Sequence, residues 1–136
     1  MAKVISIAGI ILAALIGYWV YHGFFKPLPE VPTIAKKLGA HFEKSGIKVA
    51  PRTIRHSYHD LVAQVEYDIE DYPLGISLSV CKSVDSAKRH FASIKDSPNL
   101  NFPVQKGNLV LYLIYWKESD LTNKVLESFN TYDPST

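Results

Sequence analysis

The sequence predicts an α+β domain carried on a membrane-spanning helix, and three observations lead to this prediction. An uncharged run extends from Val4 to Phe25. Beyond it, short segments alternate apolar and polar residues and are joined by turn residues, as in antiparallel strands. Other segments repeat apolar residues every three or four positions, as in helices. We expect a helix, three strands, a helix, one or two strands and a helix, forming a mostly antiparallel four- or five-stranded sheet with about three helices.

The apolar run is long enough to cross a bilayer, because about 20 apolar residues in a helix span the hydrocarbon core of roughly 30 Å. Aromatic residues crowd its C-terminal end, from Tyr18 to Phe25, where they suit a membrane interface. A cleaved signal peptide is the alternative, but these bulky rings occupy the zone where a small-residue cleavage site would lie. We therefore assign residues 1–25 to an uncleaved signal-anchor helix.

The orientation of this helix is not decided by its flanking charges, because lysines lie on both sides of it. The very short N-terminal tail is typical of signal-anchor proteins, whose C-terminal domain is exported. We expect the domain on the periplasmic or extracellular side, with a bacterial inner membrane favoured.

One face of the predicted anchor is lined by small residues, Gly9, Ala13 and Gly17, at intervals of four. Such spacing lets a second helix approach closely in lipid. The expected partners are therefore the lipid bilayer and either a second copy of the chain or a helix of a larger membrane complex. The alternative is the ordinary Ala and Gly content of an anchor.

Residues 26–32 contain three prolines and are predicted to form a stiff, extended stalk. The length that remains suits one domain, which we place at 33–131, with 132–136 as a flexible tail. Within it, Thr33 is expected to cap a helix that runs to Ser45 before Gly46.

Three strands are expected next, at 47–56, 61–69 and 76–81. In the second, Leu61 to Ile69 alternate, with the odd-numbered positions on one face. If the first two strands form a hairpin with His56 opposite Val62, Arg52 lies opposite Glu66 and Lys48 opposite Glu70. Opposite charges at facing positions favour this register.

The second half continues with a helix capped by Ser83, whose expected buried stripe is Val84, Ala87, Phe91 and Ile94. Strands are expected at 102–105 and 109–116. A last helix is capped by Ser119. On the strand at 109–116, Tyr112, Ile114 and Trp116 share one face, and they form a candidate partner surface if that face is open. The alternative is that the helix at 33–45 covers this face as a third layer.

The densest group of ligand-type side chains is His56, His59 and Asp60. Histidines and a carboxylate can bind a divalent metal, but residues three apart on an extended chain point to opposite faces. We interpret the segment as a polar hairpin loop and predict no metal and no cofactor. The only cysteine, Cys81, is interpreted as a small residue at a strand end, although the adjacent Lys82 and helix start would lower the pKa of a thiol.

The function expected from these features is that of a non-catalytic interaction or accessory subunit of a membrane assembly. A net charge of +2 gives no basic field for nucleic acid. The sequence contains no nucleophile, phosphate-loop or metalloprotease motif. One alternative is a module that binds a small apolar ligand or lipid at the membrane surface. A less favoured one is a metal-dependent enzyme that uses the loop of His56 and His59.

Overall fold

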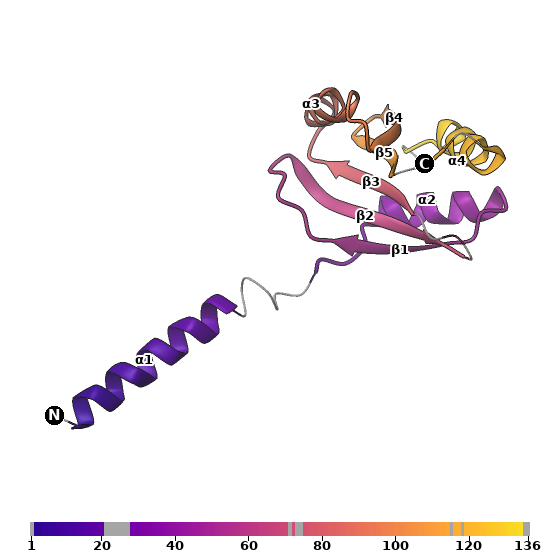
Figure 1. The fold of residues 1–136 in the computed structure, drawn as a ribbon. Coiled ribbons are helices and arrows are strands. Elements are labelled where there is room, and N and C mark those ends of the chain that lie inside the picture. Colours follow the sequence, from indigo (N-terminus) through magenta and orange to yellow (C-terminus); the bar gives the residue numbers. More distant parts are fainter. Residues whose placement is uncertain are drawn as a thin grey trace.

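A computed structural model describes residues 2–20, 28–70, 72, 75–114, 116–117 and 119–134. In these residues the fold is α+β, with four helices and a five-stranded antiparallel sheet, which confirms the α+β class and the antiparallel sheet that the sequence predicts (Figure 1). The elements are α1 (Ala2–Val20), α2 (Thr33–Lys44), β1 (Val49–Ile54), β2 (Leu61–Ile69), β3 (Ile76–Cys81), α3 (Val84–Ile94), β4 (Leu100–Lys106), β5 (Leu109–Ile114) and α4 (Asp120–Thr131).

The sheet has the strand order β1-β2-β3-β5-β4, and every neighbouring pair is antiparallel. The last two strands form a hairpin whose turn contains Gly107 at φ +58. Because β5 lies between β3 and β4, the most apolar strand occupies an interior position and β4 forms the edge. Leu109, Leu111 and Leu113 on β5 are completely buried.

The predicted register of β1 and β2 is confirmed, with Arg52 opposite Glu66. Arg52 Nη2 lies 3.1 Å from Glu66 Oε1, and Lys48 Nζ lies 3.5 Å from Glu70 Oε2. Arg52 Nε also donates to Asp68 Oδ2 at 2.8 Å, a diagonal contact that the sequence analysis did not include. Apart from Glu66, which is partly buried, these side chains are at least half exposed, so each pair contributes at most about 1 kcal/mol, but together they favour one register.

A β-bulge at the start of β2 changes which face Leu61 occupies. Leu61 pairs with Cys81, whereas Ala63 pairs with Val80, so β2 has one extra residue over this interval. The expectation that Leu61 and Ala63 share a face is therefore wrong. Leu61 packs in a different hydrophobic cluster from Ala63, and Val62 is 56% exposed.

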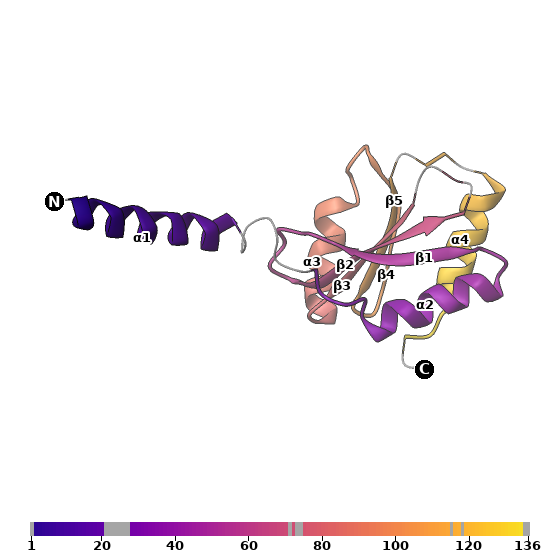
Figure 2. The same cartoon turned by 90° about the horizontal axis from the view of Figure 1, so that it is seen from below.

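Helices cover both faces of the sheet, so the domain has three layers (Figure 2). On one face, α2 and α4 supply Leu38, Phe42, Val125 and Phe129 to the larger cluster. On the other face, α3 packs against β3, β4 and β5 and contributes Ala87 and Ile94 to the smaller cluster. The second face is thus covered by α3 and not by the helix at 33–45, which was the alternative considered from the sequence.

Two of the three expected helix caps are present. Ser83 Oγ accepts a hydrogen bond from Ser86 N at 3.0 Å, and Ser119 Oγ accepts one from Thr122 N at 3.2 Å. Thr33 does not cap α2, because Pro32 occupies the N-cap position and makes no side-chain bond there. In α3, Val84 is 47% exposed, so its place in the predicted buried stripe is wrong.

The chain on either side of the predicted domain also packs against it. Thr53 Oγ1 donates to the carbonyl oxygen of Pro29 at 2.7 Å, and Val31 packs against the larger cluster. Residues 28–32 of the predicted stalk therefore lie along the domain, while 26 and 27 are outside the described residues. Tyr132, predicted to begin the tail, is 5% exposed and its hydroxyl donates to the Ile34 carbonyl at 3.3 Å, so the domain includes it.

The N-terminal helix α1 lies apart from the domain (Figure 1), and its side chains from residue 7 to residue 20 are all exposed. The helix predicted over the run Val4–Phe25 is present as far as Val20, and 21–25 fall outside the described residues. Over the part of the chain that the structure describes, no helix has the length and apolar character needed to cross a membrane.

Replacing Leu111 tests the packing of the three layers. Leu111 is 0% exposed in the centre of β5, so Leu111→Ala leaves a cavity and is expected to lower the free energy of unfolding by about 2–5 kcal/mol. Urea denaturation followed by circular dichroism in detergent measures this loss. Val62→Ala, on an exposed position of β2, is the control and should cost less than about 0.5 kcal/mol. Equal losses in the two variants would contradict the assigned core.

Candidate functional site

The loop before β2 contains the three metal-ligand candidates, and polar atoms of two of them, His56 and Asp60, have other partners. His56 Nδ1 lies 3.1 Å from the Tyr58 carbonyl oxygen, and Asp60 Oδ1 accepts a hydrogen bond from Arg89 Nη2 at 3.3 Å. His59 is exposed. Across the described ranges, no three or more His, Cys, Asp or Glu side chains are grouped closely enough to hold a metal ion. The loop is thus a surface segment joined to α3 by the ion pair of Asp60.

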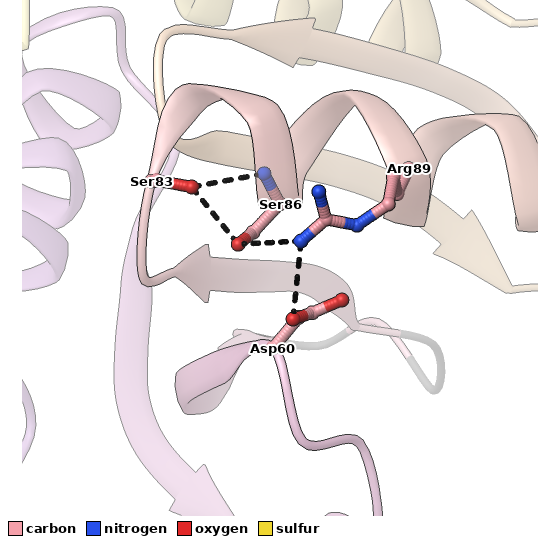
Figure 3. A network of polar contacts seen from close by, with 4 residues as sticks. All are labelled: Asp60, Ser83, Ser86 and Arg89. Atoms are coloured by element: carbon pink, nitrogen blue, oxygen red, sulfur yellow. Dashed lines mark hydrogen bonds and ion pairs between the residues drawn. The ribbon is translucent and has the colours of Figure 1, made fainter.

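This ion pair belongs to a polar network that joins the loop to the start of α3 (Figure 3). Arg89 Nη2 reaches both Asp60 and, at 3.3 Å, Ser86 Oγ, and Ser86 Oγ lies 2.9 Å from Ser83 Oγ. The backbone adds a bond from Lys82 N to the Asp60 carbonyl at 2.9 Å. Residues far apart in the sequence therefore hold the 55–60 loop beside the first turns of α3.

A buried polar network lies between the sheet and α3, and the sequence analysis did not identify it. Ser79 Oγ donates to Gln64 Oε1 at 2.7 Å and lies 3.0 Å from His90 Nε2. Gln64 Nε2 donates to the Tyr112 hydroxyl at 3.2 Å. The signal available in the sequence was the alternation of Ser77 and Ser79 with apolar residues, which places the two serines on one face of the strand.

The hydrogen bonds of the network determine which ring nitrogen of His90 carries a proton, and burial determines the charge of the ring. Because the Ser79 hydroxyl donates its proton to Gln64, the hydrogen bond from His90 runs from Nε2–H to Ser79 Oγ. Burial lowers the pKa of His90 and outweighs the opposing effect of the Asp60 carboxylate. The imidazole is therefore neutral near pH 7. Ser79 is 0% and His90 6% exposed, so this Ser–His contact lies out of reach of a substrate.

Cys81 is not an activated thiol. Its side chain is 1% exposed, and burial raises the pKa of the thiol to about 11. The lowering expected from Lys82 and the start of α3 is absent, because desolvation of the thiolate dominates at this position. A thiol that stays protonated at neutral pH is a poor nucleophile.

The exposed aromatic surface expected on β5 is not present. Tyr112 is 8% exposed and lies under α3, and Ile114 is half-buried against the same cluster. Trp116 is 3% exposed and packs in the cluster on the opposite face, where Tyr72 lies against it with ring centroids 5.0 Å apart. The third layer formed by α3 closes the face on which the prediction of a partner surface depended.

A surface hollow of about 380 Å³ lies between α2 and the end of α4. Charged and polar groups form most of its lining: Lys37, His41, Lys44, Thr131, Tyr132 and Asp133. An apolar ligand is usually held by a mainly hydrophobic cavity. This hollow therefore offers little to the small apolar ligand considered from the sequence.

The small residues of α1 line an open surface. Gly9, Ala13 and Gly17 are exposed, and beyond the adjacent residues and the backbone of the helix itself a Cβ added at either glycine would meet no atom within 4 Å. The large residues around them are exposed as well, among them Ile10 at 67% and Trp19 at 73%. In the described part of the chain, most of the large hydrophobic residues that are exposed lie in this helix.

The chain matches no protein-family model, no curated protein and no solved structure. Its fold class is that of an α+β domain with helices on both faces of an antiparallel sheet.

Acidification tests the buried network. A histidine whose pKa is lowered by folding stabilises the folded state above its ordinary pKa of 6.5, and this stability is lost as the pH falls below that value. We expect the free energy of unfolding to decrease between pH 7 and pH 5. In His90→Gln, which keeps a donor without titrating, the decrease should be smaller. Urea denaturation at several pH values measures it.

The matched control for this test is His59→Gln in the exposed loop, which should retain the pH dependence of the unchanged protein. A His90→Gln variant with that same dependence would contradict the role assigned to the buried imidazole. As a second variant, Ser79→Ala leaves Gln64 and His90 without their shared partner and should lower the free energy of unfolding by about 1–3 kcal/mol at pH 7.

Proposed function

We propose that this chain is a single-pass membrane protein whose α+β domain serves as a non-catalytic interaction or accessory subunit of a membrane assembly. The observation that carries the proposal is the exposure of α1. Its described side chains are almost all apolar, and those from residue 7 to residue 20 are exposed. Burial of apolar surface contributes roughly 25 cal/mol per Å², so such a helix is stable only where another apolar medium covers it.

A lipid bilayer is the medium proposed to cover α1. The uncharged run continues in the sequence to Phe25, beyond the end of the described helix at Val20. About 20 apolar residues match the thickness of the hydrocarbon core. The aromatic residues at the end of the run suit the headgroup layer. We propose that the domain lies on the exported side, and a bacterial inner membrane remains the favoured location.

Support for a role in an assembly comes from the small face of α1. Gly9, Ala13 and Gly17 leave a strip without large side chains along a helix that is otherwise lined with Ile and Leu. Between helices in lipid, contact depends on close packing, and small residues allow it. The proposed partner is a second copy of the chain or a helix of another subunit.

Support for a non-catalytic role comes from the burial and pairing of the side chains that could otherwise act in catalysis. The Cys81 thiol is buried and protonated, and the contact of Ser79 with His90 is closed to solvent. The Asp60 carboxylate is paired with Arg89. Each of these groups has a structural partner or environment that accounts for it.

Insertion of α1 can be tested with a charge at its centre. The complete chain should remain in the membrane pellet after alkaline carbonate extraction. Ile11→Asp places a carboxylate at the middle of the helix, at a cost of about 2.5–3.5 kcal/mol for insertion, and should release much of the protein. Ile11→Leu is the control and should behave as the unchanged chain. Release of the unchanged chain by carbonate would refute the anchor.

The proposed partner contact is tested by filling the small face. Gly9→Leu combined with Gly17→Leu should abolish the oligomer or the co-purifying subunit seen by native mass spectrometry from detergent. Ala8→Leu adds a similar side chain on another part of the helix surface and should leave the assembly intact. If the double variant assembles as the unchanged chain does, α1 has no packing role. A lone monomer that carries bound lipid would instead favour a binding module.

A further inference from the structure

Most of the exposed large apolar side chains of the domain lie at one end of the sheet. Outside α1, the described residues of this kind are Leu28 at 44%, Tyr58 at 51%, Val62 at 56%, Tyr72 at 38% and Val84 at 47%. Four of them, Leu28, Tyr58, Val62 and Val84, form what we call the proximal rim. Tyr72 lies at the opposite end, beside Trp116.

The strand pairing brings the rim together. β1 ends and β2 begins at the same end of the sheet, with Tyr58 in the connecting loop and Val62 near the start of β2. Leu61 pairs with Cys81, the last residue of β3, so the start of α3 at Val84 lies at this end too. The hydrogen bond from Thr53 to Pro29 brings the neighbouring Leu28 to the end of β1.

Contacts within the domain hold the rim in place. The network in Figure 3 ties the loop to α3 through Asp60 and Arg89. The ring of Tyr58 packs edge-on against His90 with centroids 5.0 Å apart, although about half of its surface remains exposed. An ordered surface of this kind loses little conformational entropy when it binds another molecule. The burial of its exposed apolar groups is then the main favourable contribution to the free energy of binding.

The rim lies on the side of the domain from which α1 approaches (Figures 1 and 2). Pro29, which is bound to the end of β1, follows the last residue of the apolar run, Phe25, by four positions. Four residues of fully extended chain reach roughly 14 Å. A bilayer surface at the end of the run would therefore lie close to this end of the domain.

The charges beside the rim suit lipid headgroups. Arg55 and Lys82 are exposed at this end, and both can contact phosphate groups. The Asp60 carboxylate is paired with Arg89, and Asp85 lies in the first turn of α3, where it stabilises the helix dipole. Tyrosine combines an apolar ring with a polar hydroxyl and is enriched at membrane interfaces.

We propose that the proximal rim rests on the headgroup layer of the same bilayer that holds α1, an inference that depends on the membrane anchor proposed above. Leu28, Tyr58, Val62 and Val84 enter the interface, and Arg55 and Lys82 meet lipid phosphates. The end of the sheet that carries Tyr72 then points away from the membrane. The domain has one orientation and does not swing on a free stalk.

Spin labels on the complete chain test this orientation in vesicles of phosphatidylethanolamine and phosphatidylglycerol. Labels are attached to Tyr58→Cys in the rim, to Asp96→Cys in the exposed turn between α3 and β4, and to Leu15→Cys in α1. The native Cys81 is buried and its raised pKa disfavours labelling. Collision with oxygen, which concentrates in hydrocarbon, is compared with collision with a water-soluble nickel chelate.

The expected result is a label at residue 58 whose collision rate with nickel is severalfold lower than that of the label at 96, while the label at 15 collides mainly with oxygen. Equal nickel access at 58 and 96, with residue 15 in hydrocarbon, would overturn the inference and leave the membrane anchor intact. Nickel access at residue 15 would refute the anchor itself and the inference with it.

A second rim position guards against a local effect of the label at residue 58, whose ring contacts His90. Val84→Cys replaces an exposed side chain at the first position of α3, and its label should show the same severalfold loss of nickel access. Circular dichroism confirms that each labelled chain is folded. Protection at neither rim position in folded protein would contradict the proposed contact.

Discussion

The burial of β3 on both faces is the constraint on which the rest of the domain depends. All six of its residues are buried, apolar on one face and Ser77, Ser79 and Cys81 on the other. A strand in this position needs helices on both sides, and α2 with α4 and α3 supply them. Buried hydroxyl groups also need partners, because an unpaired one costs free energy. Gln64 and His90 meet that need for Ser79.

The same constraint limits where function can lie. With both faces covered, Ser79, His90 and Cys81 lie inside the described domain and Asp60 is paired with Arg89, so the outer surface remains for contact with other molecules. Two parts of that surface are apolar: the side chains of α1 and the proximal rim. Both are at the end of the domain where Pro29 binds to Thr53. The membrane proposed on that side would account for both with a single partner, and it would leave the opposite end and the α2–α4 surface for the proposed partner subunits.

Much of the fold could be predicted because its signals are local. The alternation in β2 and β3, the caps Ser83 and Ser119, and the facing charges of Arg52 and Glu66 involve neighbours in the sequence or one hairpin. The predictions that failed depended on longer-range packing. The bulge reverses Leu61, and α3 covers Tyr112. Tyr132 is buried against the domain, and its hydroxyl donates a hydrogen bond to the carbonyl of Ile34, which is far away in the sequence.

By itself the sequence determined the period of each element, the order of the elements and the register of the first hairpin, because these follow from side-chain spacing and from facing charges. Only the tertiary structure decided which helix covers which face. That choice depends on how three helices share the two sides of one sheet, a competition among contacts that no segment encodes alone. The packing of the helices buries Ser79 and His90 as hydrogen-bond partners and covers the aromatic surface expected on β5. It leaves Tyr58, Val62 and Val84 exposed at one end of the sheet.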